Sequence, residues 1–469
     1  MPPPLVVIYN TNSQISKEIA EYYSAKRNIP ENRLIGIPCT TEEVINKDYY
    51  NAEIRDVLRS ELEMRGLKDS IKYIVTTKGL PLKIIVNPNK CWTIQSGGGS
   101  LESFLCLLYD DIAPYCATNA KNHYFRKDEQ FRSFTFTYTT TCPDTIDGII
   151  SYLVTRLDAY TKEEVFGMID RSVDSDKSGL GYYLLDGDPH RPYDDMDTAA
   201  INLSQLGLAD RVIYETTQQN IFNLSADSML IGYCGHGRHA SSDPPANPFM
   251  GWTPETGYLG GASFSWLNGA AFITYESFNG YSFLYENNEC SGVLLGHVDN
   301  QNLVADFIRD GGTVGFGHVY EPYIGNVAHE AIFFERYARG YNFIEAAYMS
   351  LPVLYFHNVV VGDPLCIINP ELSGKPDSTE EEVSFKLHQN FPNPFNDYTI
   401  IRYELSKPSI ITLYLFNALG EKIILLDAGL KDAGIHSVNF KPLRLSAGVY
   451  FFQIIVEGKP SAGKMIYLP

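Results

Sequence analysis

The sequence MLIGYCGHGRH at residues 229–239, together with AAFITYESFNGYS at 270–282, decides the fold. Each stretch begins with a short apolar run typical of a buried strand and ends in a polar turn flanked by glycine. The first turn carries His236 and the second carries Ser277. Because neighbouring parallel strands end at the same edge of a sheet, we expect these turns to lie side by side. A histidine base and a serine nucleophile would then be within hydrogen-bond reach.

Strand-like and helix-like segments alternate along residues 1–370, which predicts an α/β fold with a mostly parallel sheet. We expect an N-terminal α/β subdomain over 1–150 and a second α/β domain over 151–370. Ser13 and Thr161 are expected to begin helices as N-caps. The second domain contains six expected strands, at 182–185, 211–215, 229–234, 270–275, 313–317 and 359–362. His236 follows the third of these strands and Ser277 the fourth.

Composition limits the classes of function. A net charge of −19 argues against a nucleic-acid partner, because phosphate contacts depend on lysine and arginine. No apolar run approaches the length of about 18 residues that a membrane span needs. The eight cysteines form no Cys-x-x-Cys pair, so we expect no structural zinc and no cofactor. Four cysteines lie close enough in sequence for one or two disulfides: Cys91, Cys106, Cys116 and Cys142.

The pattern changes after residue 370. Residues 371–383 are polar and acidic, which predicts a linker. Residues 384–469 contain short alternating strands separated by glycine turns, which predicts a small β-sandwich.

The arrangement of 151–370 resembles the caspase-like cysteine peptidases, and the gingipains in particular. Gly235-His236-Gly237 is similar to the His-Gly pair of that family, and SFNG at 277–280 resembles the stretch that begins with the gingipain catalytic cysteine. VVGDPL at 360–365 resembles their last strand. The resemblance implies a caspase-like fold and a peptidase-type hydrolase acting on a peptide or protein. Serine at position 277, in place of cysteine, is the main departure.

Two further resemblances concern export. TTKGLP at 76–81 and TRLD at 155–158 are similar to a bacterial family of uncharacterised secreted proteins. QNFPNPFN at 389–396, LYLFN at 413–417 and SAGVYF at 446–451 resemble the C-terminal sorting domain of type IX secretion cargo, an immunoglobulin-like sandwich. This implies the type IX machinery as a partner of 384–469, and a secreted or cell-surface location. Such cargo carries a signal peptide, which is missing before LVVIYN at 5–10, so we expect the natural start to lie upstream or to have been trimmed.

Each candidate site residue has two interpretations. His236 and Ser277 are either a base and a nucleophile, with the backbone N–H groups of Gly237 and Ser277 binding the oxyanion, or ordinary turn residues. Asp186 and Asp188 form either an acidic specificity pocket or a solvated Asp-Gly-Asp-Pro turn. The remaining candidates lie between the third and fourth strands. Trp252 and Trp266 either line a cleft or belong to the core, and His239 is either a metal partner of His236 or a loop histidine.

Two hypotheses of function follow. The first is a secreted hydrolase of the peptidase type with a Ser277–His236 dyad. The second is a catalytically inactive pseudo-peptidase, a surface binding module that kept the cleft and lost the thiol. A serine hydroxyl is a weaker nucleophile than a thiolate and needs a well-oriented base. Reaction with a serine-directed covalent probe would distinguish the two hypotheses.

Overall fold

The computed structural model describes the chain in separate ranges. They are residues 3–86, 98–109, 122, 124–126, 152–178, 180–187, 195–215, 224, 228–235, 264–284, 303–322, 324–354, 357–369, 385–406, 409–418, 422–442, 445–456 and 459–468. Several predictions fall outside them: His236, Gly237, His239, Asp188, Trp252 and the linker expected at 371–383. The chain divides into two compact units, Met1–Gly374 and Lys375–Pro469.

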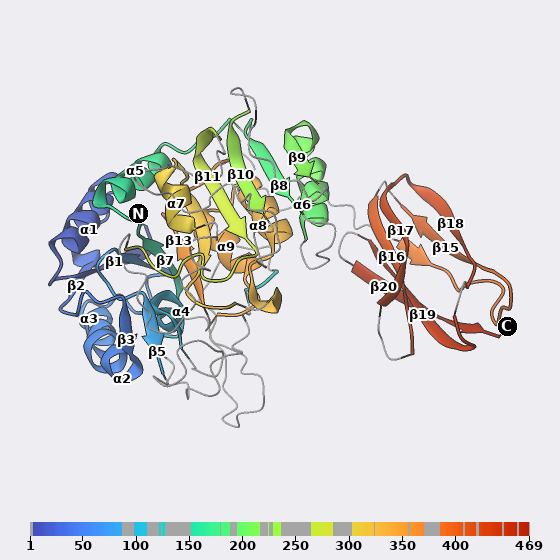
Figure 1. Cartoon of the computed structure of the whole chain (residues 1–469), viewed down its shortest axis with the longest axis horizontal. Helices are drawn as coiled ribbons and strands as arrows, with labels where there is room; N and C mark the ends of the chain where they lie inside the picture. Colours follow the sequence, from blue (N-terminus) through green and yellow to red (C-terminus); the bar gives the residue numbers. More distant parts are fainter. Residues whose placement is uncertain are drawn as a thin grey trace, which may run out of the picture. The chain divides into compact units, whose positions relative to one another are not determined.

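A ten-stranded sheet runs through the first unit (Figure 1). In spatial order its strands are β2 (Leu34–Ile37), β1 (Leu5–Asn10), β4 (Tyr73–Thr77), β7 (Leu153–Leu157), β13 (Asn358–Val361), β12 (Val314–His318), β11 (Trp266–Thr274), β10 (Leu230–Gly235), β8 (Tyr182–Asp186) and β9 (Val212–Glu215). Every described neighbouring pair is parallel except β12 and β13. The predicted mostly parallel sheet is confirmed.

The antiparallel pair β12–β13 divides this sheet into two halves that run in opposite directions. One half contains β2, β1, β4, β7 and β13, and its strands run opposite to those of the other half. At each end of the sheet, the carboxyl edge of one half therefore lies next to the amino edge of the other. Strands from 1–150 and from 151–370 belong to the same sheet, because β4 pairs with β7 and β7 pairs with β13. A single apolar core spans both halves.

Helices cover this sheet in two layers. Their bounds are α1 (Gln14–Arg27), α2 (Lys47–Tyr49), α3 (Asp56–Met64), α4 (Leu101–Cys106), α5 (Lys162–Val173), α6 (Met196–Leu203), α7 (Val304–Arg309), α8 (Glu330–Ala338) and α9 (Phe343–Ser350). α5 packs against α1 and α7, whereas α8 packs against α6 and α9. β4, β7, β10, β12 and β13 are buried at every position, as strands covered on both faces must be.

The predicted helix starts are confirmed. The Ser13 side chain accepts a hydrogen bond from the N–H of Ser16 at the start of α1. Thr161 and Glu164 form a reciprocal capping box at the start of α5. A small sheet of β3 (Val44–Asn46), β5 (Lys83–Ile85) and β6 (Gly99–Ser100) completes the described elements of the N-terminal segment.

The second unit consists of antiparallel sheets. One contains β14 (Phe385–Leu387), β15 (Thr399–Leu405) and β18 (Gly434–Phe440). The other contains β17 (Lys422–Lys431), β16 (Ser409–Phe416), β19 (Gly448–Val456) and β20 (Lys459–Tyr467). Alternate residues of β15 and β19 are buried and contribute to one shared apolar cluster, as expected for strands with one face in a core.

The cysteines of the described ranges are thiols. Cys39, Cys106, Cys234 and Cys366 are buried, and none of these four forms a disulfide. Cys106, a candidate for a disulfide in the sequence, instead lies 3.1 Å from the Tyr348 hydroxyl. Burial raises the pKa of the Cys106 thiol to about 12, so this thiol stays protonated.

Candidate functional site

Four strands end in one row at the carboxyl edge of the second half-sheet. Their register aligns Glu215, Asp186, Gly235 and Thr274 across β9, β8, β10 and β11. The N–H of Tyr275 donates to the carbonyl of Gly235 at 3.2 Å. The chain therefore leaves two neighbouring parallel strands at the same edge, after Gly235 and after Thr274. The predicted adjacency of the third and fourth strands is confirmed.

The turn that carries Ser277 is tied to the end of β12. The Asn279 side chain donates to the Thr274 hydroxyl at 2.9 Å and accepts from the N–H of His318 at 2.6 Å. Nδ1 of His318 lies 2.7 Å from the Glu276 carbonyl. Burial lowers the pKa of His318 to about 4, although the hydrogen bond to Glu276 opposes that shift. At neutral pH the ring is therefore uncharged and donates from Nδ1 to the turn.

Glycine at position 280 lets this turn approach the sheet closely. A Cβ atom built there would lie 2.9 Å from the Cα of Gly317 and 2.9 Å from a methyl group of Val359. No rotamer change relieves the contact with a backbone atom, so any larger residue would have to push the turn away from β12. Phe278 has a φ of 59°, in the left-handed region, which indicates how tightly the turn reverses.

The Ser277 hydroxyl has a carboxylate partner. Its Oγ donates to Oε2 of Glu321 at 2.5 Å, and both residues are half-buried. Glu321 lies three residues after the end of β12, so its position at this edge follows from the strand order. Glu321 was not among the residues predicted from the sequence, although it is a carboxylate just beyond the expected strand at 313–317.

A second carboxyl group lies beside the first residue of the turn. The Tyr275 hydroxyl and the N–H of Asp195 both donate to Glu330, at the start of α8. Nδ1 of His329 lies 2.5 Å from the Asp195 carboxylate. Burial raises the pKa of Glu330 to about 8, because a charged carboxylate is poorly solvated there.

Glu330→Gln should therefore change how stability depends on pH. Between pH 4.5 and 8 the folded protein holds a proton on Glu330 that the unfolded chain releases, so this residue makes the fold less stable as pH rises. The variant should gain stability relative to wild type between pH 5 and pH 8, by on the order of 3 kcal/mol. Thermal unfolding at both pH values measures this. Glu335→Gln, on the same helix and ion-paired with Arg339, is the control. An equal difference at both pH values would contradict the account.

Two other predicted site residues lie at opposite edges of this half of the sheet. Asp186 is at the carboxyl edge and is only 1% exposed, so it is not part of a solvated turn. Trp266 begins β11, at the opposite end of the strand from Thr274, or about 26 Å away at a rise of about 3.3 Å per residue. Its indole N–H donates to Asp310 at 2.8 Å, and its ring packs against Phe307. The structure therefore does not bring Trp266 together with Ser277.

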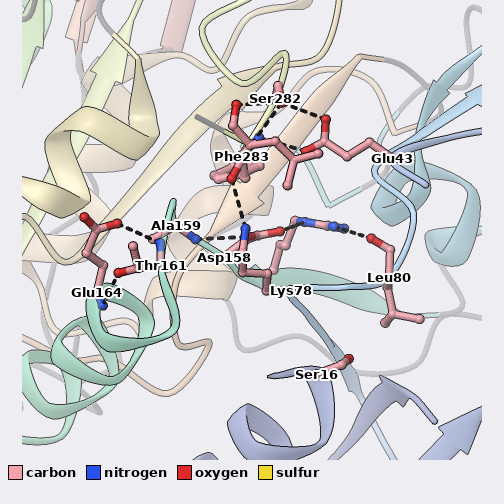
Figure 2. A network of polar contacts seen from close by, with 12 residues as sticks. Ser16, Glu43, Lys78, Leu80, Asp158, Ala159, Thr161, Glu164, Ser282 and Phe283 are labelled. Atoms are coloured by element: carbon pink, nitrogen blue, oxygen red, sulfur yellow. Dashed lines mark hydrogen bonds and ion pairs between the residues drawn. The ribbon is translucent and has the colours of Figure 1, made fainter. Parts of the chain in front are cut away.

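The segment after Ser277 is held by residues from the N-terminal segment of the chain (Figure 2). Glu43 accepts hydrogen bonds from the Ser282 hydroxyl at 2.7 Å and from the N–H of Phe283 at 2.9 Å. The ammonium group of Lys78 donates to the Phe283 carbonyl at 2.9 Å. Lys83 donates to the Tyr281 carbonyl at 2.7 Å. Residues from the N-terminal segment thus position the turn after β11, and we call Glu43, Lys78 and Lys83 the clamp.

The clamp rests on a buried ionic network. Lys78 also lies 3.2 Å from Asp158, which in turn pairs with Arg156 at 2.9 Å. Arg156 is 1% exposed and donates to Glu102 and to the carbonyls of Leu80 and Pro81. Burial disfavours its charge, but the two carboxylates more than compensate and raise the pKa of Arg156. The network contains two cations, Lys78 and Arg156, and two anions, Glu102 and Asp158. Each buried charge therefore has a partner of opposite sign, without which its burial would be costly.

The comparisons with known proteins give a family for the C-terminal unit. Residues 389–467 match the family described as secretion system C-terminal sorting domain. A tail of this kind implies a secreted or cell-surface protein and suggests an interaction with the type IX secretion machinery. No curated protein matches the chain. Within the described ranges, no helix is both long and apolar enough to cross a membrane.

Solved structures give weaker likenesses. A structure titled "Structure of Protease" is 10% identical, with a TM-score of 0.36, and the match covers 99% of this chain and 97% of that one. The sensor domain of the anti-sigma factor RsgI4 from Pseudobacteroides cellulosolvens is 17% identical over 19% of this chain and 92% of its own, with a TM-score of 0.16. PorZ, a type-IX secretion system surface component of Porphyromonas gingivalis, is 16% identical over 21% and 13%, with a TM-score of 0.13. These scores establish no shared fold.

Proposed function

We propose that this protein is a secreted hydrolase of the peptidase type, with Ser277 as its nucleophile. One observation carries the proposal: Tyr275 is hydrogen-bonded to Gly235, so the turn with Ser277 starts beside the end of the strand that His236 follows in the sequence. Ligands and catalytic groups collect at such an edge in open α/β sheets. The nucleophile would need a base from a neighbouring strand end, and the sequence predicts His236 for that role.

The proposal also includes the fold of each domain. We propose that 151–370 is a caspase-like, gingipain-like domain. The N-terminal α/β segment 1–150 precedes it, and an immunoglobulin-like sorting domain at 384–469 follows it. In support, the six expected strands of 151–370 lie next to one another in the sheet, with the third and fourth adjacent. The match of 389–467 to a sorting domain supports the export route.

The expected reaction is acyl transfer to Ser277. Oγ would attack the scissile carbonyl, and the backbone N–H groups of Gly237 and Ser277 would bind the oxyanion. Asp186 and Glu215 lie in the row of strand ends beside Gly235, and Asp188 follows two residues after Asp186. Of these carboxylates Asp186 is buried, so Glu215 and Asp188 are the ones that would favour a substrate with arginine or lysine next to the scissile bond.

A specific observation favours a second function. Because the Ser277 hydroxyl donates to Glu321, it also joins two turns at this edge, as a purely structural serine would. With serine in place of cysteine, the protein would then be a pseudo-peptidase that binds a peptide or protein without cleaving it.

Peptide amides with a fluorescent leaving group distinguish these functions. A hydrolase with an acidic edge should cleave substrates ending in arginine or lysine at least about tenfold faster than those ending in aspartate or glutamate, given roughly 1.4 kcal/mol from one charge-assisted contact. Ser277→Ala should abolish cleavage. Cleavage that survives Ser277→Ala would refute the catalytic assignment, and binding of these peptides without cleavage by wild type would favour the pseudo-peptidase.

A further inference from the structure

The contact between Ser277 and Glu321 bears on which group takes the serine proton. Oγ is 2.5 Å from Oε2 of Glu321, within the range of a short O–H···O⁻ hydrogen bond. A serine has one proton to donate, and in this structure it points at the carboxylate. A base has to be within hydrogen-bond reach of the proton that it removes, and Glu321 satisfies this requirement.

Both partners are held in place by the fold. The turn with Ser277 is bound to β12 through Asn279 and His318, and Glu321 follows that same strand. The carbonyl of Glu321 accepts from Nδ1 of His357 at 2.8 Å, which fixes its backbone. The N–H of Phe278, next to Ser277, donates to the Tyr320 carbonyl, next to Glu321. Nucleophile and carboxylate therefore belong to two turns that are hydrogen-bonded to each other.

We infer that Glu321 is the general base for Ser277, in the role that the sequence alone assigned to His236. The inference rests on the proposed function. As Oγ attacks, the bond from Oγ to the carbonyl carbon forms, the O–H bond breaks and its proton passes to Oε2 of Glu321. The carbonyl π pair moves to the oxygen. When the tetrahedral intermediate collapses, the C–N bond breaks and the Glu321 proton passes to the leaving amine. Water then repeats the same steps to release the acid.

The rate of labelling by a fluorophosphonate tests this assignment. The probe phosphonylates an activated serine and releases fluoride, so it needs the same proton transfer. Wild type should be labelled and Ser277→Ala should not. Glu321→Gln should be labelled at least about 100-fold more slowly, the lower end of the usual effect of a general base. Glu61→Gln, a glutamate on α3, is the matched control and should keep the wild-type rate.

The outcomes separate the two proposals. If wild type is not labelled, the proposed function fails, and the inference fails with it. If wild type is labelled and Glu321→Gln keeps at least a third of that rate, only the inference is overturned. Loss of labelling in His236→Ala together with retention in Glu321→Gln would return the base to His236. Tryptophan fluorescence melts confirm that each variant is folded.

A thiol at position 277 gives a readout that needs no hydrolase activity. In Ser277→Cys, the Glu321 charge should disfavour the thiolate, because a like charge raises a thiol pKa. Adding Glu321→Gln should then speed alkylation by iodoacetamide at pH 7 by about 3–10-fold, because the thiol pKa would fall by about 0.5 to 1. An unchanged alkylation rate would show that Glu321 does not contact position 277 in solution, which overturns the inference.

Discussion

Replacing Arg156 with methionine is expected to lower the free energy of unfolding of the first unit by about 3–5 kcal/mol, the usual loss when one member of a buried ionic network is removed. Glu102 and Asp158 would each lose a charged partner in the interior, where water cannot replace it. Four hydrogen bonds from the guanidinium group would also be lost, two of them to carboxylates. Methionine fills much of the same space, so packing contributes little to this loss.

Urea unfolding followed by tryptophan fluorescence measures this effect. All three tryptophans, Trp92, Trp252 and Trp266, lie in the first unit, so the signal reports on that unit alone. Arg65→Met is the control, because Arg65 pairs with Glu61 near the surface and should contribute less than about 1 kcal/mol. Adding Glu102→Gln to Arg156→Met should restore part of the loss by removing an unpaired charge. A loss from Arg156→Met no larger than that from Arg65→Met would contradict the account of this network.

The second large effect concerns the clamp. Glu43→Gln and Lys78→Met each remove charged hydrogen bonds to Ser282 or Phe283, each worth about 1.5–3 kcal/mol. The segment that continues from Ser277 should then open more often. Amide hydrogen exchange of residues 279–284 should become roughly 10–100-fold faster, because the exchange rate depends on the free energy of the local opening.

Mass-spectrometric hydrogen exchange resolves that segment from the rest of the chain. Glu42→Gln is the matched control, because Glu42 is an exposed neighbour of Glu43. Exchange in β10, a strand of the other half of the sheet, should be unchanged in all variants. The clamp assignment fails if residues 279–284 exchange at the wild-type rate in both Glu43→Gln and Lys78→Met.

The six strands of 151–370 were predictable because each is a short apolar run that ends at a polar or glycine residue. β10 and β13 differ from the expected ranges by one residue at each end. β11 begins at Trp266, earlier than the expected start at residue 270, because Trp266 packs on Phe307 and extends the core beyond the apolar run. The order of β10 and β11 followed from their place in the chain, as is usual for successive parallel strands.

Contacts between distant segments were not predictable from periodicity. Joining the two halves of the sheet depends on β7 and β13, which are about 200 residues apart and carry no local signal for each other. For the same reason the clamp could not be predicted, since Glu43 is hydrogen-bonded to Phe283, 240 residues away. Ser277 was identified from its turn, but its partner Glu321 lies on another turn 44 residues away. A single sequence gives residue types at strand ends and does not give their pairing.

The most direct test of the central claim is to identify the residue that a fluorophosphonate modifies. Wild-type protein would be treated with the probe, digested and analysed by tandem mass spectrometry, with Ser277→Ala treated in parallel. We expect a single phosphonylated serine, Ser277, and no adduct in Ser277→Ala. Wild-type protein that carries no adduct on Ser277 under conditions in which a known serine hydrolase is fully labelled would contradict it.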